Sequence, residues 1–176
     1  MDFLERDLED IIFNELQSSD GYDNLSERGL DICFSKGSFI CKRQLRIGNY
    51  GICDMVTLSR FKTIISDKGT LIQAPLYIEV IELKKGEINS ETLFQAIKYL
   101  TGIKIYMEDN YPSLVVDYSI TLIGRTINTG DWIYLIDQLH NLKVQTYSYE
   151  IDGITFKTHR GYCLKNSGLT ICKDPF

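Results

Sequence analysis

The segment that most constrains this chain is residues 77–85, which read Y-I-E-V-I-E-L-K-K. Its β-branched and aromatic side chains predict a buried strand. Glu82 and Lys84 end this strand, and because side chains alternate along a strand, both lie on one face. Two charges at the end of an apolar strand are costly to desolvate unless they are paired, hydrogen-bonded or bound to a metal. Any fold for this chain must provide such partners.

The size and composition indicate one globular domain. The chain has 176 residues, with 44% hydrophobic and 24% charged side chains, which excludes the disordered and fibrous classes. We expect a single domain over residues 1–176. No apolar run approaches the roughly 20 residues that span a bilayer, and the N-terminus is acidic rather than a basic signal segment. We therefore expect a cytoplasmic protein with no membrane partner.

The cysteines form no recognisable metal or disulfide pattern. There are five, without a C-x-x-C pair and with only two histidines, so we expect reduced and mostly buried thiols. The charges are unevenly distributed. Residues 1–35 hold 2 basic and 10 acidic side chains, whereas residues 36–104 hold 11 basic and 6 acidic ones. The basic middle third could attract a phosphate backbone, although a solvated lysine-rich face would give the same count.

Hydrophobic spacing predicts the first half of the fold. Residues 3–17 form an amphipathic helix, and the turn formers of residues 18–29 predict a loop. Three antiparallel strands should follow at residues 38–47, 52–62 and 76–85. The turns between them are predicted at residues 48–51 and 66–69.

A second helix is expected after Gly86, with Asn89 or Ser90 as its N-cap and Gly102 at its end. The later elements are predicted to be a strand at 114–123, a short helix at 131–139, and a hairpin of strands 142–149 and 154–159 that turns at residues 152–153. This order predicts an α/β fold, a mixed α+β sheet flanked by helices, in which a crossover helix adds a strand beside three antiparallel ones.

Asp54 is a second lone acid in an apolar strand, and the predicted turns put its strand beside that of Glu82. Two converging carboxylates would suit Mg²⁺ or Mn²⁺, with Lys84 placed to hold a phosphate or a polarised water. The alternative is a structural ion pair of Asp54 with Lys84 and an exposed Glu82. On the second helix, Gln95 and Tyr99 are expected to share a polar face with Glu91 and Lys98, roughly opposite a core stripe of Leu93, Ala96, Ile97 and Leu100.

The pattern Asp54, Glu82-Leu83-Lys84, Gln95-x-x-x-Tyr99 resembles the PD-(D/E)XK nuclease superfamily. It is most similar to the branch with a Q-x-x-x-Y helix, which includes RecB-type nuclease domains and NucS-like endonucleases. The resemblance covers roughly residues 3–100. It implies a restriction-endonuclease-like core, in the order α-β-β-β-α-β, here followed by a helix and a hairpin. Cys53 stands where many members have a proline.

The resemblance also implies roles for individual residues. Asp54 and Glu82 would bind the metal, the Leu83 carbonyl would assist, and Lys84 would act on the attacking water or the phosphate. Gln95 and Tyr99 would support the site or contact nucleic acid. Members often add an acid from the first helix, for which Glu5 and Glu9 compete. Candidates for contacts with the nucleic-acid backbone are Arg43, Arg46, Arg60, Lys62 and Lys98, which could equally be ordinary surface charges.

The leading hypothesis is a Mg²⁺-dependent nuclease that hydrolyses phosphodiester bonds of DNA, as an endonuclease and in a homodimer if two strands are cut. A second hypothesis is a catalytically inactive module on the same fold that binds nucleic acid or a partner protein. A third is an acidic effector that presents its first helix to a basic protein and binds no divalent metal.

Overall fold

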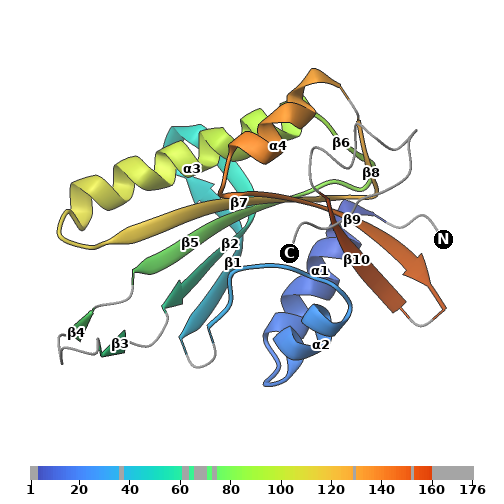
Figure 1. Cartoon of the computed structure of the whole chain (residues 1–176), viewed down its shortest axis with the longest axis horizontal. Coiled ribbons are helices and arrows are strands. Elements are labelled where there is room, and N and C mark those ends of the chain that lie inside the picture. The colour runs from blue at the N-terminus through green and yellow to red at the C-terminus, as the bar shows by residue number, and fades with distance from the viewer. Residues whose placement is uncertain are drawn as a thin grey trace.

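The computed structural model describes residues 4–35, 38–60, 64–65, 71–72, 75–128, 130–151 and 153–159. These residues build a mixed α/β fold around a six-stranded sheet with the strand order β1-β2-β5-β7-β9-β10 (Figure 1). The strands are β1 (Phe39–Ile47), β2 (Gly51–Arg60), β5 (Leu76–Leu83), β7 (Val116–Gly124), β9 (Leu142–Glu150) and β10 (Gly153–His159). The predicted strands and the C-terminal hairpin are therefore confirmed. The predicted turn at residues 66–69 lies outside the described residues, as does position 152.

The first three strands of the sheet are antiparallel, as predicted, and the next two are parallel to β5. A parallel neighbour requires a crossover. The helix α3 (Ser90–Asn110) makes the crossover from β5 to β7, and α4 (Tyr134–Gln138), preceded by the 3-10 turn Asp131–Ile133, makes the one from β7 to β9. The remaining strands pair as two short ladders, β3 (Ile64–Ile65) with β4 (Leu71–Ile72) and β6 (Glu87–Ile88) with β8 (Thr126–Ile127).

Helices cover both faces of the sheet and bury two apolar clusters. Helices α3 and α4 cover one face, while α1 (Glu5–Leu16) and α2 (Gly21–Glu27) cover the other (Figure 1). Under α3, the core contains Val56 and Val80, and under α1 it contains Ile81 and Leu83. Consecutive residues of β5 thus alternate between the two cores, which fixes the register of this strand.

The helix α2 corrects the predicted loop at residues 18–29. The turn-forming composition of this segment predicted a loop, but its one leucine, Leu25, is fully buried in the cluster under α1 and packs the segment as a helix. Tyr22, on the same helix, stacks on Phe34 with ring centroids 3.9 Å apart. Tertiary packing of these two residues therefore outweighs the weak helical propensity of the segment.

The helix α3 corrects a second prediction, because it continues eight residues beyond Gly102, to Asn110. Gly102 is a packing position rather than a helix end. A Cβ atom there would lie 2.6 Å from the Tyr50 ring and 2.7 Å from the Ile47 side chain. Glycine lets the tip of the β1–β2 hairpin, including the 3-10 turn Gly48–Tyr50, approach the α3 backbone. At the start of α3, Asn89 is the N-cap, as predicted, and accepts a hydrogen bond from the Thr92 amide.

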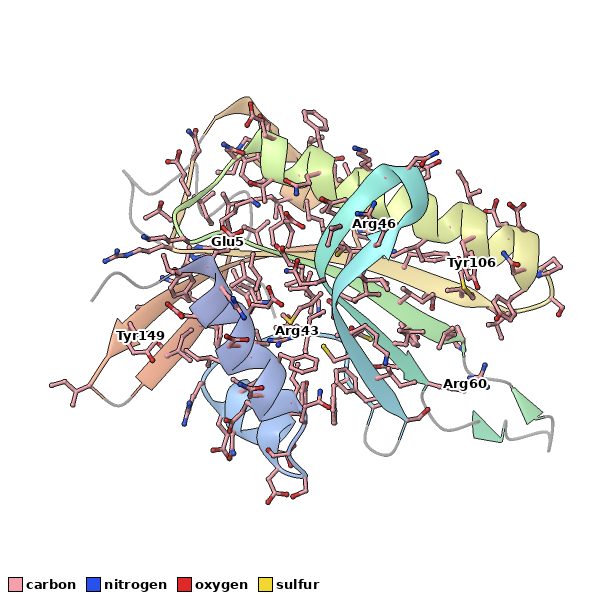
Figure 2. The ribbon with its side chains drawn as sticks, turned by 180° about the vertical axis from the view of Figure 1, so that it is seen from behind. Glu5, Arg43, Arg46, Arg60, Tyr106 and Tyr149 are labelled. Carbon is pink, nitrogen blue, oxygen red and sulfur yellow. The ribbon has the colours of Figure 1, made fainter. Side chains whose placement is uncertain are left out.

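The β1–β2 hairpin changes sides partway along its length. Cys41 and Met55 lie in the core under α1, whereas Ile47 and Cys53 lie in the core under α3. Residues an even number of positions apart share one face of a regular strand, so both strands must be distorted between these pairs. The distortion coincides with Gln44, the only described residue other than glycine with a positive φ, at 50°. The hairpin tip consequently bends over towards α3 (Figure 2).

No helix within the described residues is long and apolar enough to cross a membrane. The three described cysteines, Cys33, Cys41 and Cys53, are free thiols. Burial raises the pKa of Cys33 to about 11 and that of Cys41 to about 12, so these two thiols stay protonated near neutral pH. The remaining cysteines lie outside the described residues.

Candidate functional site

The candidate site lies where β2 and β5 stop pairing. The β2–β5 ladder ends at Met55↔Ile81, whereas β5 continues along β7 as far as Leu83↔Ile123. One residue beyond the ladder on β2, the Asp54 carboxylate accepts a hydrogen bond from the Leu83 amide at 2.8 Å. A side chain therefore replaces the backbone as the partner of β5 and puts Asp54 beside residues 82–84, as the sequence predicted.

Glu82 is the most unusual residue of the site. Its side chain is only 1% exposed, and its Oε1 atom accepts a hydrogen bond from Lys84 Nζ at 3.0 Å. Its second carboxylate oxygen, Oε2, is buried without any hydrogen-bond partner. The pKa of Glu82 is raised to about 7, first by burial and then by the negative charge of Asp54, against the opposing effect of Lys84. A carboxylate that is desolvated and half-satisfied in this way is ready to accept a proton or a cation.

Lys84 forms its ion pair with Glu82, and Glu82 is buried. The structure therefore differs from the alternative in which Lys84 pairs with Asp54 and Glu82 is exposed. Burial by itself would lower the pKa of Lys84, but the attraction of Glu82, Glu5 and Asp54 raises it overall. Lys84 is therefore a cation that faces several carboxylates. Its side chain remains about a quarter exposed, so its ammonium group can also reach a solute.

Asp54 is half-buried and its pKa is raised, first by burial and then by the neighbouring charges of Glu5 and Glu9. The hydrogen bond from the Leu83 amide and the charge of Lys84 act in the opposite direction. Several acids thus interact across α1, β2 and β5, and Lys84, directly after β5, compensates only part of their charge.

The two acids of α1 reach different partners. Glu5, at the first turn of the helix (Figure 2), accepts a hydrogen bond from the Lys85 amide at 3.1 Å. Its charge acts on both Glu82 and Asp54. Glu9 is buried and accepts a hydrogen bond from Gln44 at 2.7 Å, with Arg43 Nε at 3.9 Å from its other oxygen. Glu5 therefore faces the end of β5, and Glu9 is held by β1.

Gln95 and Tyr99 occur together on α3, but not on the polar face that was predicted. Tyr99 is only 5% exposed and belongs to the core under α3, while its hydroxyl accepts a hydrogen bond from Gln95 at 2.8 Å. Burial raises the pKa of Tyr99, and the charges of Glu82 and Asp54 contribute to that rise. The pair thus lies on the inner side of the helix, near the carboxylates.

The predicted stripes of α3 need correction accordingly. Leu93 and Ala96 are buried as predicted, but the buried side of α3 also includes Tyr99 and Ile103. The expected core residues Ile97 and Leu100 are only partly buried against the same core. The other two members of the predicted polar face, Glu91 and Lys98, are exposed. The i, i+4 spacing was correct, but the direction of the face was wrong, because Gly102 allows the hairpin tip to cover this side of the helix.

The predicted basic residues do not gather at one place. Arg43 forms ion pairs with Asp10 and Glu9 and lies over the Phe13 ring, so α1 already binds its guanidinium group. Arg46 is near the hairpin tip and Arg60 near the opposite end of β2 (Figure 2). Lys98 is exposed on α3, and Lys62 lies outside the described residues.

Sequence reasoning missed a second buried acid on β5, Glu79, which lies on the face opposite to that of Glu82. Its carboxylate accepts hydrogen bonds from the Thr121 hydroxyl and the Cys33 amide, each at 2.7 Å, and Lys143 lies 3.9 Å away. The signal was present, because Glu79 is also a lone acid in an apolar strand. These partners attach the segment before β1 to the sheet, so Glu79 has a structural role.

Among the residues that the structure describes, no three histidine, cysteine or acidic side chains come close enough together to enclose a metal ion by themselves. Comparison with protein-family models, curated proteins and solved structures found no match. The interpretation of the site therefore depends on its own geometry and on the motif.

Proposed function

We propose that this protein is a Mg²⁺- or Mn²⁺-dependent nuclease with a restriction-endonuclease-like core, which hydrolyses phosphodiester bonds of DNA as an endonuclease. The order α-β-β-β-α-β of its main elements and the D…E-x-K…Q-x-x-x-Y pattern support the proposal. The antiparallel strands β1, β2 and β5, followed by the crossover helix α3 and the parallel strand β7, agree with such a core.

The observation that carries the proposal is the unsatisfied Oε2 atom of Glu82. A buried carboxylate oxygen without a partner costs roughly 1–3 kcal/mol or more, and nearby Asp54 adds electrostatic repulsion. A bound cation would remove both penalties. The contrast with Glu79, whose two carboxylate oxygens are both hydrogen-bonded, supports a ligand role for Glu82 and not for Glu79.

The donor set fits Mg²⁺ or Mn²⁺. Mg²⁺ is usually bound by one or two protein carboxylates, with waters and substrate phosphates completing its shell, so a closed cage of three acids is not required. We assign Asp54, Glu82 and the Leu83 carbonyl as ligands, with Glu5 as the acid of α1 that adds negative charge to the site without being a third carboxylate ligand. When bound, such an ion activates water and neutralises negative charge at the phosphate.

The other residues have supporting roles in this proposal. Lys84, already paired with Glu82, orients the attacking water or holds the scissile phosphate with its partly exposed ammonium group. Gln95 and Tyr99, hydrogen-bonded to each other on α3, pack behind the carboxylates and support the site from this side. Arg46, Arg60 and Lys98 are the exposed candidates for contacts with the nucleic-acid backbone.

Cleavage assays test the proposal. Labelled duplex, branched and single-stranded DNA, and matched RNA, should be incubated with the protein in Mg²⁺, Mn²⁺ or chelator. We expect metal-dependent cleavage of at least one DNA substrate, abolished by Asp54→Asn or Glu82→Gln. Glu108→Gln, an exposed acid near the far end of α3, is the matched control and should retain activity.

The same assay identifies the alternatives. Protein that binds DNA in Ca²⁺, yet cleaves nothing in Mg²⁺ or Mn²⁺, would refute the enzyme and favour a binding module on this fold. Absence of both cleavage and divalent-metal binding would favour an acidic effector. Cleavage of both duplex strands in one encounter, together with sedimentation as a dimer, would favour a homodimer.

A further inference from the structure

A kink in β1 lies directly across from Asp54. The Cα partners of β1 and β2 run to Arg43↔Met55 and resume at Leu45↔Cys53, so the register stays the same on both sides. The pair that is missing between them is Gln44 with Asp54. Gln44 has a φ of 50°, which residues with a side chain rarely adopt. The ladder is thus interrupted, without an inserted residue, at the aspartate that we assign to the metal.

This interruption determines where the Asp54 side chain lies. Met55 belongs to the core under α1 and Cys53 to the core under α3, so β2 changes faces at Asp54. Asp54 is paired with neither neighbouring strand, because its pair with β1 is missing and the last pair between β2 and β5 is that of Met55 with Ile81. Its carboxylate instead accepts the Leu83 hydrogen bond at 2.8 Å. A regular hairpin would continue the ladder through Asp54 and direct its side chain into one of the packed faces.

Helix α1 holds the kink. Gln44 Nε2 donates a hydrogen bond to Glu9 Oε2 at 2.7 Å, and Glu9 is only 6% exposed. The other oxygen of Glu9 lies 3.9 Å from Arg43 Nε, so both oxygens face β1. Strained backbone persists where surrounding contacts stabilise it, and it is concentrated at functional sites.

We propose that Gln44 and Glu9 are a positioning pair for Asp54. Their hydrogen bond stabilises the kink, and the kink keeps the Asp54 carboxylate on the Leu83 amide at the end of β5. The effect of this pair on metal binding rests on the function proposed above, whereas its effect on the orientation of the Asp54 carboxylate does not. On this inference Glu9 does not bind the metal itself, which leaves Glu5 as the acid that α1 contributes.

Two measurements test the pair, on the full chain. The first is the amide proton shift of Leu83 in metal-free protein, which reports the hydrogen bond to Asp54. The second is the Kd for Mn²⁺ from titration calorimetry. Gln44→Ala removes the bond to Glu9. Gln44→Asn also removes this bond, because the asparagine side chain is one methylene shorter. Asparagine tolerates a positive φ, so the variant protein should retain its fold. Ile40→Ala, exposed on the same strand, is the control.

In both Gln44 variants we expect the Leu83 amide proton to move towards its non-bonded shift and the Kd for Mn²⁺ to rise by about 10-fold or more, as for other residues that orient metal ligands. Ile40→Ala should change neither quantity. Glu9→Gln keeps an oxygen for Gln44, so it should preserve the Leu83 shift and most of the Mn²⁺ affinity, whereas Glu9→Ala should resemble Gln44→Ala.

An unchanged Leu83 shift in both Gln44 variants would overturn the inference. So would an unchanged Mn²⁺ affinity in these variants when the wild type binds Mn²⁺. Loss of Mn²⁺ binding in Glu9→Gln with a normal Leu83 shift would identify Glu9 as a ligand, and would also overturn it. If the wild type binds no Mn²⁺, the metal-dependent function fails, and the Leu83 shift alone decides whether the pair positions Asp54.

Discussion

Two buried glutamates on one strand differ in how many of their carboxylate oxygens are hydrogen-bonded. Glu79 and Glu82 are both fully buried on β5, three residues apart, and face opposite sides of the sheet. Hydrogen bonds from Thr121 and the Cys33 amide use both oxygens of Glu79. Lys84 uses only one oxygen of Glu82. The difference gives Glu82 properties that can be measured in the metal-free protein.

Glu82 should make stability depend on pH. Its pKa is about 7 in the folded protein against an ordinary value of 4.5, so between these values the folded state binds more protons than the unfolded state. The free energy of unfolding should therefore fall as the pH rises through this window, by up to about 3 kcal/mol. Glu82→Gln should remove that part of the fall.

Urea unfolding between about pH 5 and pH 8 measures this effect. The free energy of unfolding of Glu82→Gln, relative to that of the wild type, should increase with pH. Glu108→Gln, which changes an exposed acid, should follow the wild type throughout. A constant difference between Glu82→Gln and the wild type would show that Glu82 titrates normally.

Lys84→Ala separates an enzyme from a module that only binds. If Lys84 acts on the attacking water or on the developing charge of the phosphate, its removal should lower single-turnover cleavage by at least about 100-fold. DNA affinity, measured in Ca²⁺, should fall only modestly. A variant that loses affinity instead, with about one unit less salt dependence and unchanged turnover, would assign Lys84 to phosphate binding alone.

The residues of the site were predictable where a charged side chain interrupts an apolar strand in the sequence. Asp54, Glu82 and Lys84 are charges in apolar strands, and the structure brings them together. The kink at Gln44 had no such signal, because glutamine is not typical of a positive φ. The ion pairs of Arg43 with α1 were not predictable from the sequence either, because its partners Asp10 and Glu9 lie more than thirty residues away in the chain.

At the scale of elements, α3 connects the core to the site. Leu93 is fully buried on its inner side, whereas its neighbour Phe94 is 61% exposed. Leu93→Ala should therefore lower the free energy of unfolding by about 2–4 kcal/mol. Phe94→Ala, the control on the same turn, should change it by no more than about 0.5 kcal/mol. Chemical denaturation compares them, and equal losses would mean that the helix is oriented differently.

Gly102 tests the packing of the hairpin tip on α3. An alanine in a helix is ordinarily about 1 kcal/mol more favourable than a glycine. Here its Cβ would lie 2.6 Å from the Tyr50 ring and 2.7 Å from Ile47, so Gly102→Ala should instead destabilise by about 1–3 kcal/mol. Thermal unfolding with Gly86→Ala as control, where a Cβ meets nothing within 4 Å, checks the sign. A stabilised Gly102→Ala would show that the tip does not pack there.

Elements were predicted well where packing and local signals agree. The apolar, β-branched and aromatic runs between turn signals predicted all six strands of the main sheet, β1, β2, β5, β7, β9 and β10. The two errors came from turn-forming residues. The helix α2 forms around Leu25 despite its composition, and Gly102 serves close packing instead of ending α3. Both depend on contacts between segments distant in sequence, which local propensity does not contain.

For the whole molecule, the mixed sheet with helices on both faces was predictable from the order of elements, but the arrangement of charge was not. The count of charges suggested a basic middle third, yet α1 pairs with Arg43, and Arg46 and Arg60 lie at opposite ends of the β1–β2 hairpin. Only the folded chain shows that the acidic helix covers part of the basic segment.

A divalent cation should stabilise the whole molecule. Binding only to the folded state raises stability by about 2.7 kcal/mol at a concentration 100-fold above Kd. Mn²⁺ should therefore raise the Tm, more strongly above pH 7 than below it, because protonated Glu82 competes with the ion. Asp54→Asn should abolish the shift, and Glu108→Gln should preserve it. An equal shift in all three proteins would indicate binding elsewhere.

The kink at Gln44 has a consequence for how copies of this protein behave towards one another. In the described part of the chain, β1 is an outer strand of the sheet, and an outer strand offers backbone groups on which a second molecule can add its own strand. The break at Gln44 divides β1 into two shorter stretches, 39–43 and 45–47, and Lys42 and Arg46 add charge to them. Neither stretch offers a long flat edge, so we expect the kink that we assign to positioning Asp54 also to disfavour edge-to-edge pairing between copies.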